Sequence, residues 1–163
     1  MTIRDAQPHD FDAIARLNLE SEHFMSRMDR ARLDVLASQC AYLRVAEADR
    51  DIAAFLIGFA PGSAYTSENY RWFCERYPSF LYVDRIAVDG RFRGRGLGVA
   101  LYEDFFAFAR KRGIDRVVAE FDINPPNPVS ARLHERFGFR EVGSRQVSYA
   151  DKRVSMQEAP VAQ

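Results

Sequence analysis

The stretch RIAVDGRFRGRGLGVALYEDFFAFARKRG, residues 85–113, joins an apolar segment to an amphipathic one through a glycine-rich loop. Upstream, FLYVDRIAV at 80–88 is typical of a buried strand, and apolar residues recur at helical spacing over 97–108. Gly113 is suited to ending the helix. These residues therefore predict a strand, a glycine-rich loop and a helix in succession.

The glycines of the loop do not match the common nucleotide-binding patterns. Gly94, Gly96 and Gly98 lack the spacing of a dinucleotide fingerprint, and the Gly-Lys pair of a Walker A loop is missing. A single short copy also differs from a repetitive RNA-binding arginine-glycine tract. Converging backbone N–H groups at a helix start, with Arg93 and Arg95 as cationic arms, instead predict an anion cradle for a pyrophosphate. The alternative is a tight turn with solvated arginines.

The composition indicates one folded domain spanning residues 1–163. The chain is 47% hydrophobic and 13% aromatic, which excludes a disordered protein. Lys and Arg number 23 and Asp and Glu also number 23, so the chain has no overall positive field. We therefore expect neither nucleic acid nor a membrane surface as a partner.

Cysteine usage points to a reducing compartment. Cys40 and Cys74 are far apart and the three histidines are scattered, so the sequence predicts neither a disulfide framework nor a metal site. Residues 1–14 do not read as a secretory leader, and no apolar run is long enough to span a bilayer. We expect a cytoplasmic protein.

The remaining patterns predict alternating strands and helices, and the aromatic-rich connection at 61–80 is predicted to be a loop. In chain order the expected elements are a strand at 2–6, a helix from Pro8, a helix at 29–40, a hairpin of strands at 41–49 and 52–60, a strand at 80–88, a helix from 97 to about 113, a strand at 115–123, a helix capped by Asn127 that begins at Pro128, and a closing hairpin at 140–159.

Two motifs carry a resemblance to a known family. RIAVDGRFRGRGLG resembles the acetyl-coenzyme A signature of the GNAT superfamily of N-acetyltransferases, and NPVSARLHERFGF at 127–139 resembles the second conserved block of that superfamily. The element order resembles that of the superfamily along the whole chain. Within the superfamily, YVDRIAV, NPPNP and a histidine in the second block are most similar to a bacterial group of predicted acetyltransferases. The resemblance implies an α+β (α/β three-layer) fold, with a mixed, splayed sheet of about seven strands flanked by about four helices.

What the resemblance implies for the cosubstrate is acetyl-CoA lying in the gap between the strands at 80–88 and 115–123, with no metal. The pantetheine arm would bond to backbone of Ile86 and Val88, and the oxyanion of the reaction would meet a backbone N–H at a strand bulge near Val88. The cofactor-binding residues implied are Ile86, Val88, Arg93, Gly94, Arg95, Gly96, Leu97, Gly98, Asn127 and Ser130.

The leaving-group acid departs from the family pattern. Relatives usually carry a tyrosine in the second block, where this chain has His134. An imidazole titrates near neutrality and is suited to donating a proton to a thiolate. The alternative is that His134 packs or hydrogen-bonds the sulfur without transferring a proton.

Three carboxylates are candidates for the general base. Asp122 lies where several relatives carry a strand glutamate, and it ranks ahead of Asp84 on the central strand. Glu120 shares a face with Asp122 by strand alternation and is the third candidate. Both aspartates have an alternative role, the organisation of hydrogen bonds at strand ends.

The implied reaction is acetyl transfer from acetyl-CoA to a primary amine by direct attack in a ternary complex, and the sequence does not name the amine. The alternatives are a noncatalytic acyl-CoA-binding sensor and, less favoured, a phosphate-contacting nucleic-acid module. Relatives often dimerise, so a homodimer is a candidate assembly, although the sequence does not determine the oligomeric state. The residues expected to border the acceptor cavity, or alternatively to cap the core, are Tyr65, Asn69, Tyr70, Trp72 and Phe73.

Overall fold

A hairpin of strands β2 (Tyr42–Ala48) and β3 (Asp51–Phe59) lies within the sheet of the computed structural model, which describes residues 1–21, 26–124 and 126–163. Asp49 and Arg50 form its turn with φ of 53° and 68°. Two left-handed residues in succession match the right-handed twist of the flanking strands, so the turn predicted between the strands is confirmed.

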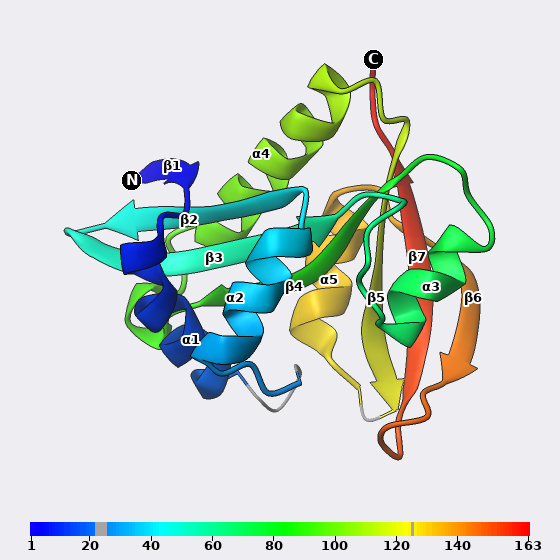
Figure 1. Cartoon of the computed structure of the whole chain (residues 1–163). Helices are drawn as coiled ribbons and strands as arrows, with labels where there is room; N and C mark the ends of the chain where they lie inside the picture. Colours follow the sequence, from blue (N-terminus) through cyan, green and yellow to red (C-terminus); the bar gives the residue numbers. More distant parts are fainter. Residues whose placement is uncertain (22–25, 125) are drawn as a thin grey trace.

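The described residues form a seven-stranded mixed sheet in the order β1-β2-β3-β4-β5-β7-β6 (Figure 1). Neighbouring strands are antiparallel except β4 and β5, which are parallel. The other bounds are β1 (Thr2–Asp5), β4 (Leu81–Val88), β5 (Arg116–Asn124), β6 (Arg140–Gln146) and β7 (Arg153–Pro160).

The sheet is splayed between β4 and β5. These strands pair only at Leu81 with Val117 and at Tyr82 with Val118, although each continues for six or more residues. Beyond that start the two backbones separate, and both edges face an open gap. The predicted splay is therefore confirmed.

The irregularity in β4 lies at Asp84, and the expectation of a bulge near Val88 is wrong. Ile57 of β3 pairs with Arg85, and Gly58 pairs with Val83, so Asp84 is an extra residue in the ladder. Next to this point, a Cβ on Gly58 would meet the Phe105 ring at 2.4 Å and the carbonyl of Tyr82 at 2.9 Å. Glycine thus allows the helix carrying Phe105 to approach the sheet where the strand bulges.

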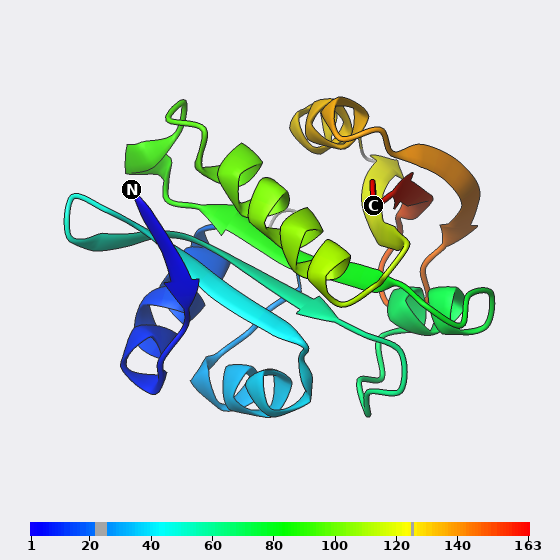
Figure 2. The same cartoon turned by 90° about the horizontal axis from the view of Figure 1, so that it is seen from above.

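Helices cover both faces of the sheet (Figure 2). On one face lie α1 (Phe11–Glu20), α2 (Arg30–Gln39) and α3 (Glu68–Cys74); on the other lie α4 (Leu97–Lys111) and α5 (Pro128–Arg136). The order is the predicted one apart from α3 and short 3-10 turns at Pro8–Asp10 and Gly90–Phe92.

Helix α3 corrects the prediction of a loop and brings the α-helices of the described residues to five rather than about four. The hydroxyl of Ser67 accepts a hydrogen bond from the Tyr70 amide at 3.4 Å, which caps the helix start. Tyr70 and Phe73 are buried one turn apart. A helix of seven residues shows too little periodicity to stand out from sequence, and burial of these two rings stabilises it.

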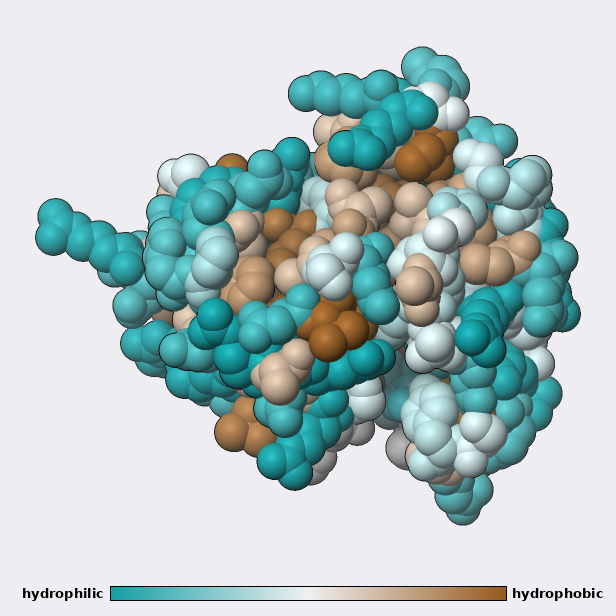
Figure 3. Space-filling view, viewed as in Figure 1, coloured by the Kyte–Doolittle hydropathy of each residue, from teal (hydrophilic) through white to brown (hydrophobic). Residues whose placement is uncertain are grey.

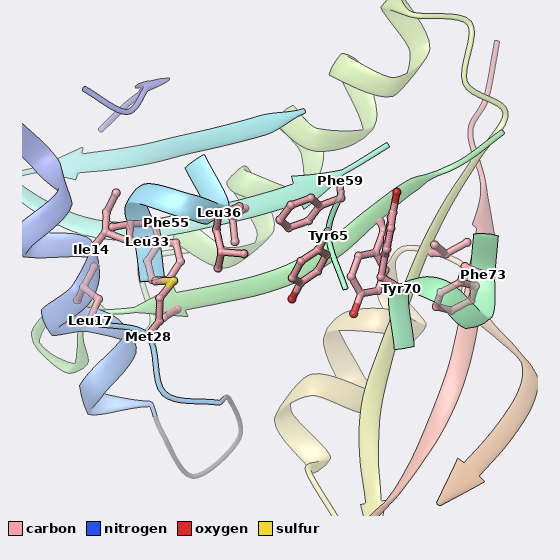
Figure 4. Packing of buried hydrophobic residues seen from close by; sticks show 14 of the residues in the cluster. Ile14, Leu17, Met28, Leu33, Leu36, Phe55, Phe59, Tyr65, Tyr70 and Phe73 are labelled. Atoms are coloured by element: carbon pink, nitrogen blue, oxygen red, sulfur yellow. The ribbon is translucent and has the colours of Figure 1, made fainter. Parts of the chain in front are cut away.

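Two apolar clusters hold the layers together, one on each face of the sheet. The first packs α1, α2 and α3 on the sheet and forms a continuous row from Ile14 and Leu17 to Tyr70 and Phe73 (Figure 4). The second packs α4 and α5 on the opposite face around Phe105. With two independent faces buried, the central strands β3 and β4 are nearly all apolar.

Candidate active site

A cavity of about 1090 Å³ occupies the gap between β4 and β5. In the space-filling view, a notch at the lower edge separates the half that carries α1 and α2 from the half that carries β5 to β7 (Figure 3). Of the residues expected to border the acceptor cavity, Tyr65 and Asn69 line it, whereas Tyr70, Trp72 and Phe73 pack in the apolar core. All the predicted catalytic and cofactor-binding residues lie in the described ranges, and all but Arg95 line this cavity. Those lining it are Asp84, Ile86, Val88, Arg93, Gly94, Gly96, Leu97, Gly98, Asp122, Asn127, Ser130 and His134.

The glycine loop forms an open concavity at the start of α4. Gly94 and Gly96 have φ of 81° and 77°, and a Cβ on either would meet nothing within 4 Å. Gly96 is the N-cap, so the amides of the first turn of this helix face the cavity without side-chain caps. Unpaired amides at the positive end of a helix favour an anion.

The three arginines of the loop differ in orientation. Arg95 donates from Nη1 to Oδ2 of Asp49 at 2.9 Å and lies over the Phe92 ring, so its side chain turns toward the β2–β3 hairpin. Arg91 is held by Asp89. The expectation that Arg95 supplies a cationic arm therefore has no support in this geometry, and Arg93 is the arginine of the loop that lines the cavity.

The backbone of β4 presents hydrogen-bonding groups to the gap. The Asp89 amide donates to the carbonyl of Ala53 in β3 at 2.8 Å. Because consecutive residues of a strand point their amides to opposite sides, Ile86 and Val88 direct theirs away from β3 and toward β5. The gap thus exposes backbone donors and acceptors to a ligand.

Glu120 is the most perturbed carboxyl in the cavity. It accepts hydrogen bonds from the Tyr82 hydroxyl, at 2.9 Å to Oε1 and 2.8 Å to Oε2, and from Nδ2 of Asn69 at 3.2 Å. Burial raises the pKa of Glu120 to about 8; the hydrogen bond from Tyr82 opposes this shift, and the charge of Asp84 adds to it. Its pKa therefore lies close to neutrality, as acid–base catalysis requires.

Asp84 and Asp122 each have a cationic partner. Asp84 accepts from the Tyr65 hydroxyl at 2.6 Å and from Nε of Arg85 at 3.2 Å, and burial raises its pKa although Arg85 opposes the shift. Nζ of Lys152 lies 3.2 Å from Oδ1 of Asp122. No such ion pair involves Glu120 among the residues that the structure describes.

His134 is buried beside Tyr102 and not free to titrate near neutrality. Burial lowers the pKa of His134 to about 4, so the expectation of titration near pH 7 is wrong. Its Nδ1 lies 2.6 Å from the carbonyl of Ser130, which can only accept, so Nδ1 carries the proton. The neutral ring then accepts at Nε2 from the Tyr102 hydroxyl, 3.3 Å away.

Sequence reasoning missed Tyr102 and Tyr82, whose hydroxyls contact His134 and Glu120. Tyr82 stands in the predicted strand at 80–88 and Tyr102 beside the apolar residues of the predicted helix from 97. The available signal was a phenolic hydroxyl in an otherwise apolar stretch, because a buried hydroxyl requires a polar partner.

The described residues contain no group of three or more His, Cys, Asp or Glu side chains placed to hold a metal ion. Within the same ranges, no helix combines the length and apolar character needed to cross a membrane. The cavity instead joins an anion cradle, exposed strand amides, a carboxyl with a raised pKa and a phenolic hydroxyl. This combination suits proton transfer and oxyanion stabilisation on a ligand with an anionic tail.

Comparison with known proteins agrees with this chemistry. The family model described as "Acetyltransferase (GNAT) family" matches residues 9–139. Among curated proteins, a phosphinothricin N-acetyltransferase of Streptomyces coelicolor is 47% identical over 51 residues, which are 31% of this chain and 29% of that protein. The match thus spans less than a third of the relative's length.

Solved structures share the fold over almost the whole chain. Ard1 from Thermoplasma volcanium has a TM-score of 0.80 at 20% identity, covering 99% of this chain and 98% of that one. The acetyltransferase yncA from Salmonella typhimurium, solved with its cofactor acetyl-CoA, has a TM-score of 0.73 at 19% identity, covering 99% and 94%. At these identities the likeness concerns the fold.

Proposed function

The chain belongs to the acetyltransferase (GNAT) family, and from this premise we propose that it transfers an acetyl group from acetyl-CoA to a primary amine by direct attack in a ternary complex. One observation carries the proposal: a single cavity lies between the open cradle at the start of α4 and the carboxyl of Glu120.

The residues around the gap fit acetyl-CoA as the acyl donor. The loop amides from Arg93 to Gly98 would hold the pyrophosphate, and the backbone of Ile86 and Val88 would bond the pantetheine arm. Asn127 and Ser130 would form the opposite wall. Gly94 and Gly96 have no side chain and open space where a Cβ would lie, which supports this assignment because a phosphate must approach the backbone closely.

Glu120 takes the role of general base in this proposal, ahead of Asp122 and Asp84. The attacking amine must lose a proton, and a carboxyl with a pKa of about 8 is a stronger base than one with an ordinary pKa. Asp84 and Asp122 are held in ion pairs with Arg85 and Lys152, whereas Glu120 has no ion pair among the described residues. The two aspartates would organise the site around Glu120.

The leaving thiolate would be met by Tyr102, with His134 as its positioning residue. As the amine nitrogen bonds the acetyl carbon and the carbon–sulfur bond breaks, the Tyr102 hydroxyl turns from Nε2 of His134 to the sulfur and gives it a proton. Burial raises the pKa of Tyr102, so its hydroxyl is protonated before the reaction begins. A β4 amide of Ile86 or Val88 would stabilise the oxyanion.

We infer further that the protein acts in the cytoplasm on an amine acceptor, without nucleic acid or membrane as partner. Equal numbers of basic and acidic residues, 23 of each, support this. Two free cysteines, Cys40 and Cys74, suit a reducing compartment. A homodimer is proposed on the family resemblance alone.

Calorimetric titration with acetyl-CoA, beside its 3′-dephospho form and an oligonucleotide, is the first test. We expect saturable one-to-one binding of acetyl-CoA, followed by thiol release with a panel of amines. Binding without turnover of any amine would identify a noncatalytic sensor. Absence of binding by folded protein would overturn the assignment of the cradle.

A further inference from the structure

One end of the cavity is bordered by exposed arginines. Arg27 lines the cavity from the segment before α2 and Arg32 from the first turn of that helix, and both residues are exposed. From this feature we propose that the acceptor is an amine that also carries an anionic group, the free amino acid being the simplest such molecule. This inference rests on the proposed function and names its substrate class.

The two arginines have no carboxylate partner among the residues that the structure describes, unlike the other cations at this end of the cavity. Arg85 is buried and donates to Asp84, to Oδ1 of Asn18 and to the backbone and hydroxyl of Ser26. Lys152 pairs with Asp122. Because Arg85 and Lys152 are already compensated, Arg27 and Arg32 are, among the described cations at this end, the ones available to bind an anion.

The acidic groups of the cavity do not offset this charge. Glu68 accepts hydrogen bonds from the amide and hydroxyl of Ser148 and is paired with Arg145 at 3.4 Å. Glu120, with a pKa of about 8, is largely protonated at neutral pH. The free acceptor site therefore attracts an anion at the α2 wall.

Arg27, Arg32, Asp84 and Glu120 all line the same cavity. The charge of Arg32 favours the ionised form of Asp84, and the charge of Asp84 in turn raises the pKa of Glu120. Asp84 is thus electrostatically coupled to both groups. A small molecule spanning them would place its anionic group at Arg32 and Arg27 and its amine at Glu120.

The same arrangement disfavours acceptors with several positive charges. A polyamine or a lysine-rich peptide would bring its second cation toward Arg27 and Arg32, where like charges repel. Binding of the acceptor's anionic group at the arginines would also orient its amine toward Glu120, so the arginines would contribute to orientation as well as affinity.

The test compares each free amino acid with its carboxamide, because the pair differs in charge at one group. With acetyl-CoA saturating, we would measure kcat/KM for L-methionine and L-methioninamide, L-glutamine and L-glutaminamide, and for spermidine as a polyamine. We expect the acids to be preferred by roughly tenfold or more, the scale of a charge-assisted contact.

Substitutions then test whether Arg27 and Arg32 cause the preference for the acid over its amide. Arg32→Ala and Arg27→Ala should each reduce the preference for acid over amide severalfold, through KM more than kcat. Asp29 would still cap α2 in the Arg32 variant, since its carboxylate accepts from the backbone amide of residue 32. Arg71→Ala, an exposed arginine on α3 outside the cavity, is the matched control and should keep the preference.

Amides or spermidine used as well as the acids would overturn the inference while leaving the acetyltransferase intact. A preference for acids that survives both arginine substitutions would also overturn it. If no amine is turned over, calorimetry of the same pairs with the CoA-saturated protein decides, because equal binding of acid and amide contradicts the inference. Failure of acetyl-CoA itself to bind is a different result and concerns the proposed function.

Discussion

The hydroxyl of Tyr102 on α4 lies 3.3 Å from Nε2 of His134 on α5, and both side chains are buried at the edge of the cavity. Helix α4 begins at the glycine loop proposed as the anion cradle, and α5 carries residues that line the cavity. One hydrogen bond therefore connects the two elements proposed to hold acetyl-CoA. The same bond holds the Tyr102 hydroxyl beside His134, which stands where the family resemblance implies a tyrosine.

Removal of the Tyr102 hydroxyl should slow chemistry more than it weakens binding. We expect Tyr102→Phe to lower kcat by roughly 100-fold, within the range of general acid catalysis, with the Kd of acetyl-CoA changed by less than about threefold. Steady-state kinetics and calorimetry measure the two quantities. Tyr77→Phe, outside the cavity, is the control, and an unchanged kcat in Tyr102→Phe would remove this hydroxyl from the mechanism.

The buried imidazole should make the fold sensitive to acid. The pKa of His134 in the folded protein, about 4, lies below its usual value of 6.5, so the unfolded chain binds more protons between these values. The free energy of unfolding attributable to this ring is present above pH 6.5 and is lost as the pH falls toward 4, by about 1–3 kcal/mol.

Chemical denaturation of wild type and His134→Gln at pH 7 and pH 5 measures this loss. The wild type should lose more stability over that interval than the variant. Equal losses would mean that the ring is solvated and protonates normally. His134→Ala should also lower turnover more than it weakens acetyl-CoA binding, since the ring orients Tyr102.

The pH dependence of the reaction should report Glu120. A base acts only when deprotonated, so kcat/KM should rise with pH through an apparent pKa near 8. Glu120→Gln should lower kcat/KM by roughly 100-fold and remove the rise of kcat/KM near pH 8. Asp122→Asn is the matched change at the paired carboxylate and should retain it. If kcat/KM of Glu120→Gln still rose with pH through a pKa near 8, the titrating group would be the acceptor amine and not Glu120.

A charge placed in the cradle should repel the pyrophosphate. Gly96 has φ of 77° and open space at its Cβ, a position that Asp and Asn both tolerate better than other residues. We expect Gly96→Asp to bind acetyl-CoA at least roughly tenfold more weakly than Gly96→Asn, which matches it in shape. Equal affinities of the two folded variants would place the pyrophosphate elsewhere.

The arginines of the loop should differ in their effect on cofactor binding. Arg93 lines the cavity, whereas Arg95 is occupied with Asp49. Arg93→Ala should weaken acetyl-CoA binding severalfold and reduce its salt dependence, and Arg95→Ala should change neither by more than about twofold. The opposite order would show that Arg95 leaves Asp49 when the ligand binds.

Local sequence determined most of the elements and the place of the cradle. The apolar residues before the glycine loop follow the pattern of a strand, and those after it follow the pattern of a helix, so the position of the loop could be predicted. Asn127 and Pro128 likewise mark the start of α5. These signals lie within a few residues of one another, so they can be read without the fold. Helix α3 was missed because its stability comes from burying Tyr70 and Phe73 against distant strands.

The chemistry of the individual groups was decided by the tertiary structure. Glu120 and Asp122 are two residues apart on one strand, yet Tyr82 and Asn69 surround the first and Lys152 neutralises the second. His134 appeared suited to titrate near neutrality until burial against Tyr102 lowered its pKa, and Arg95 turned to an aspartate 46 residues away. The pKa and orientation of a side chain depend on desolvation and on partners that only folding brings together.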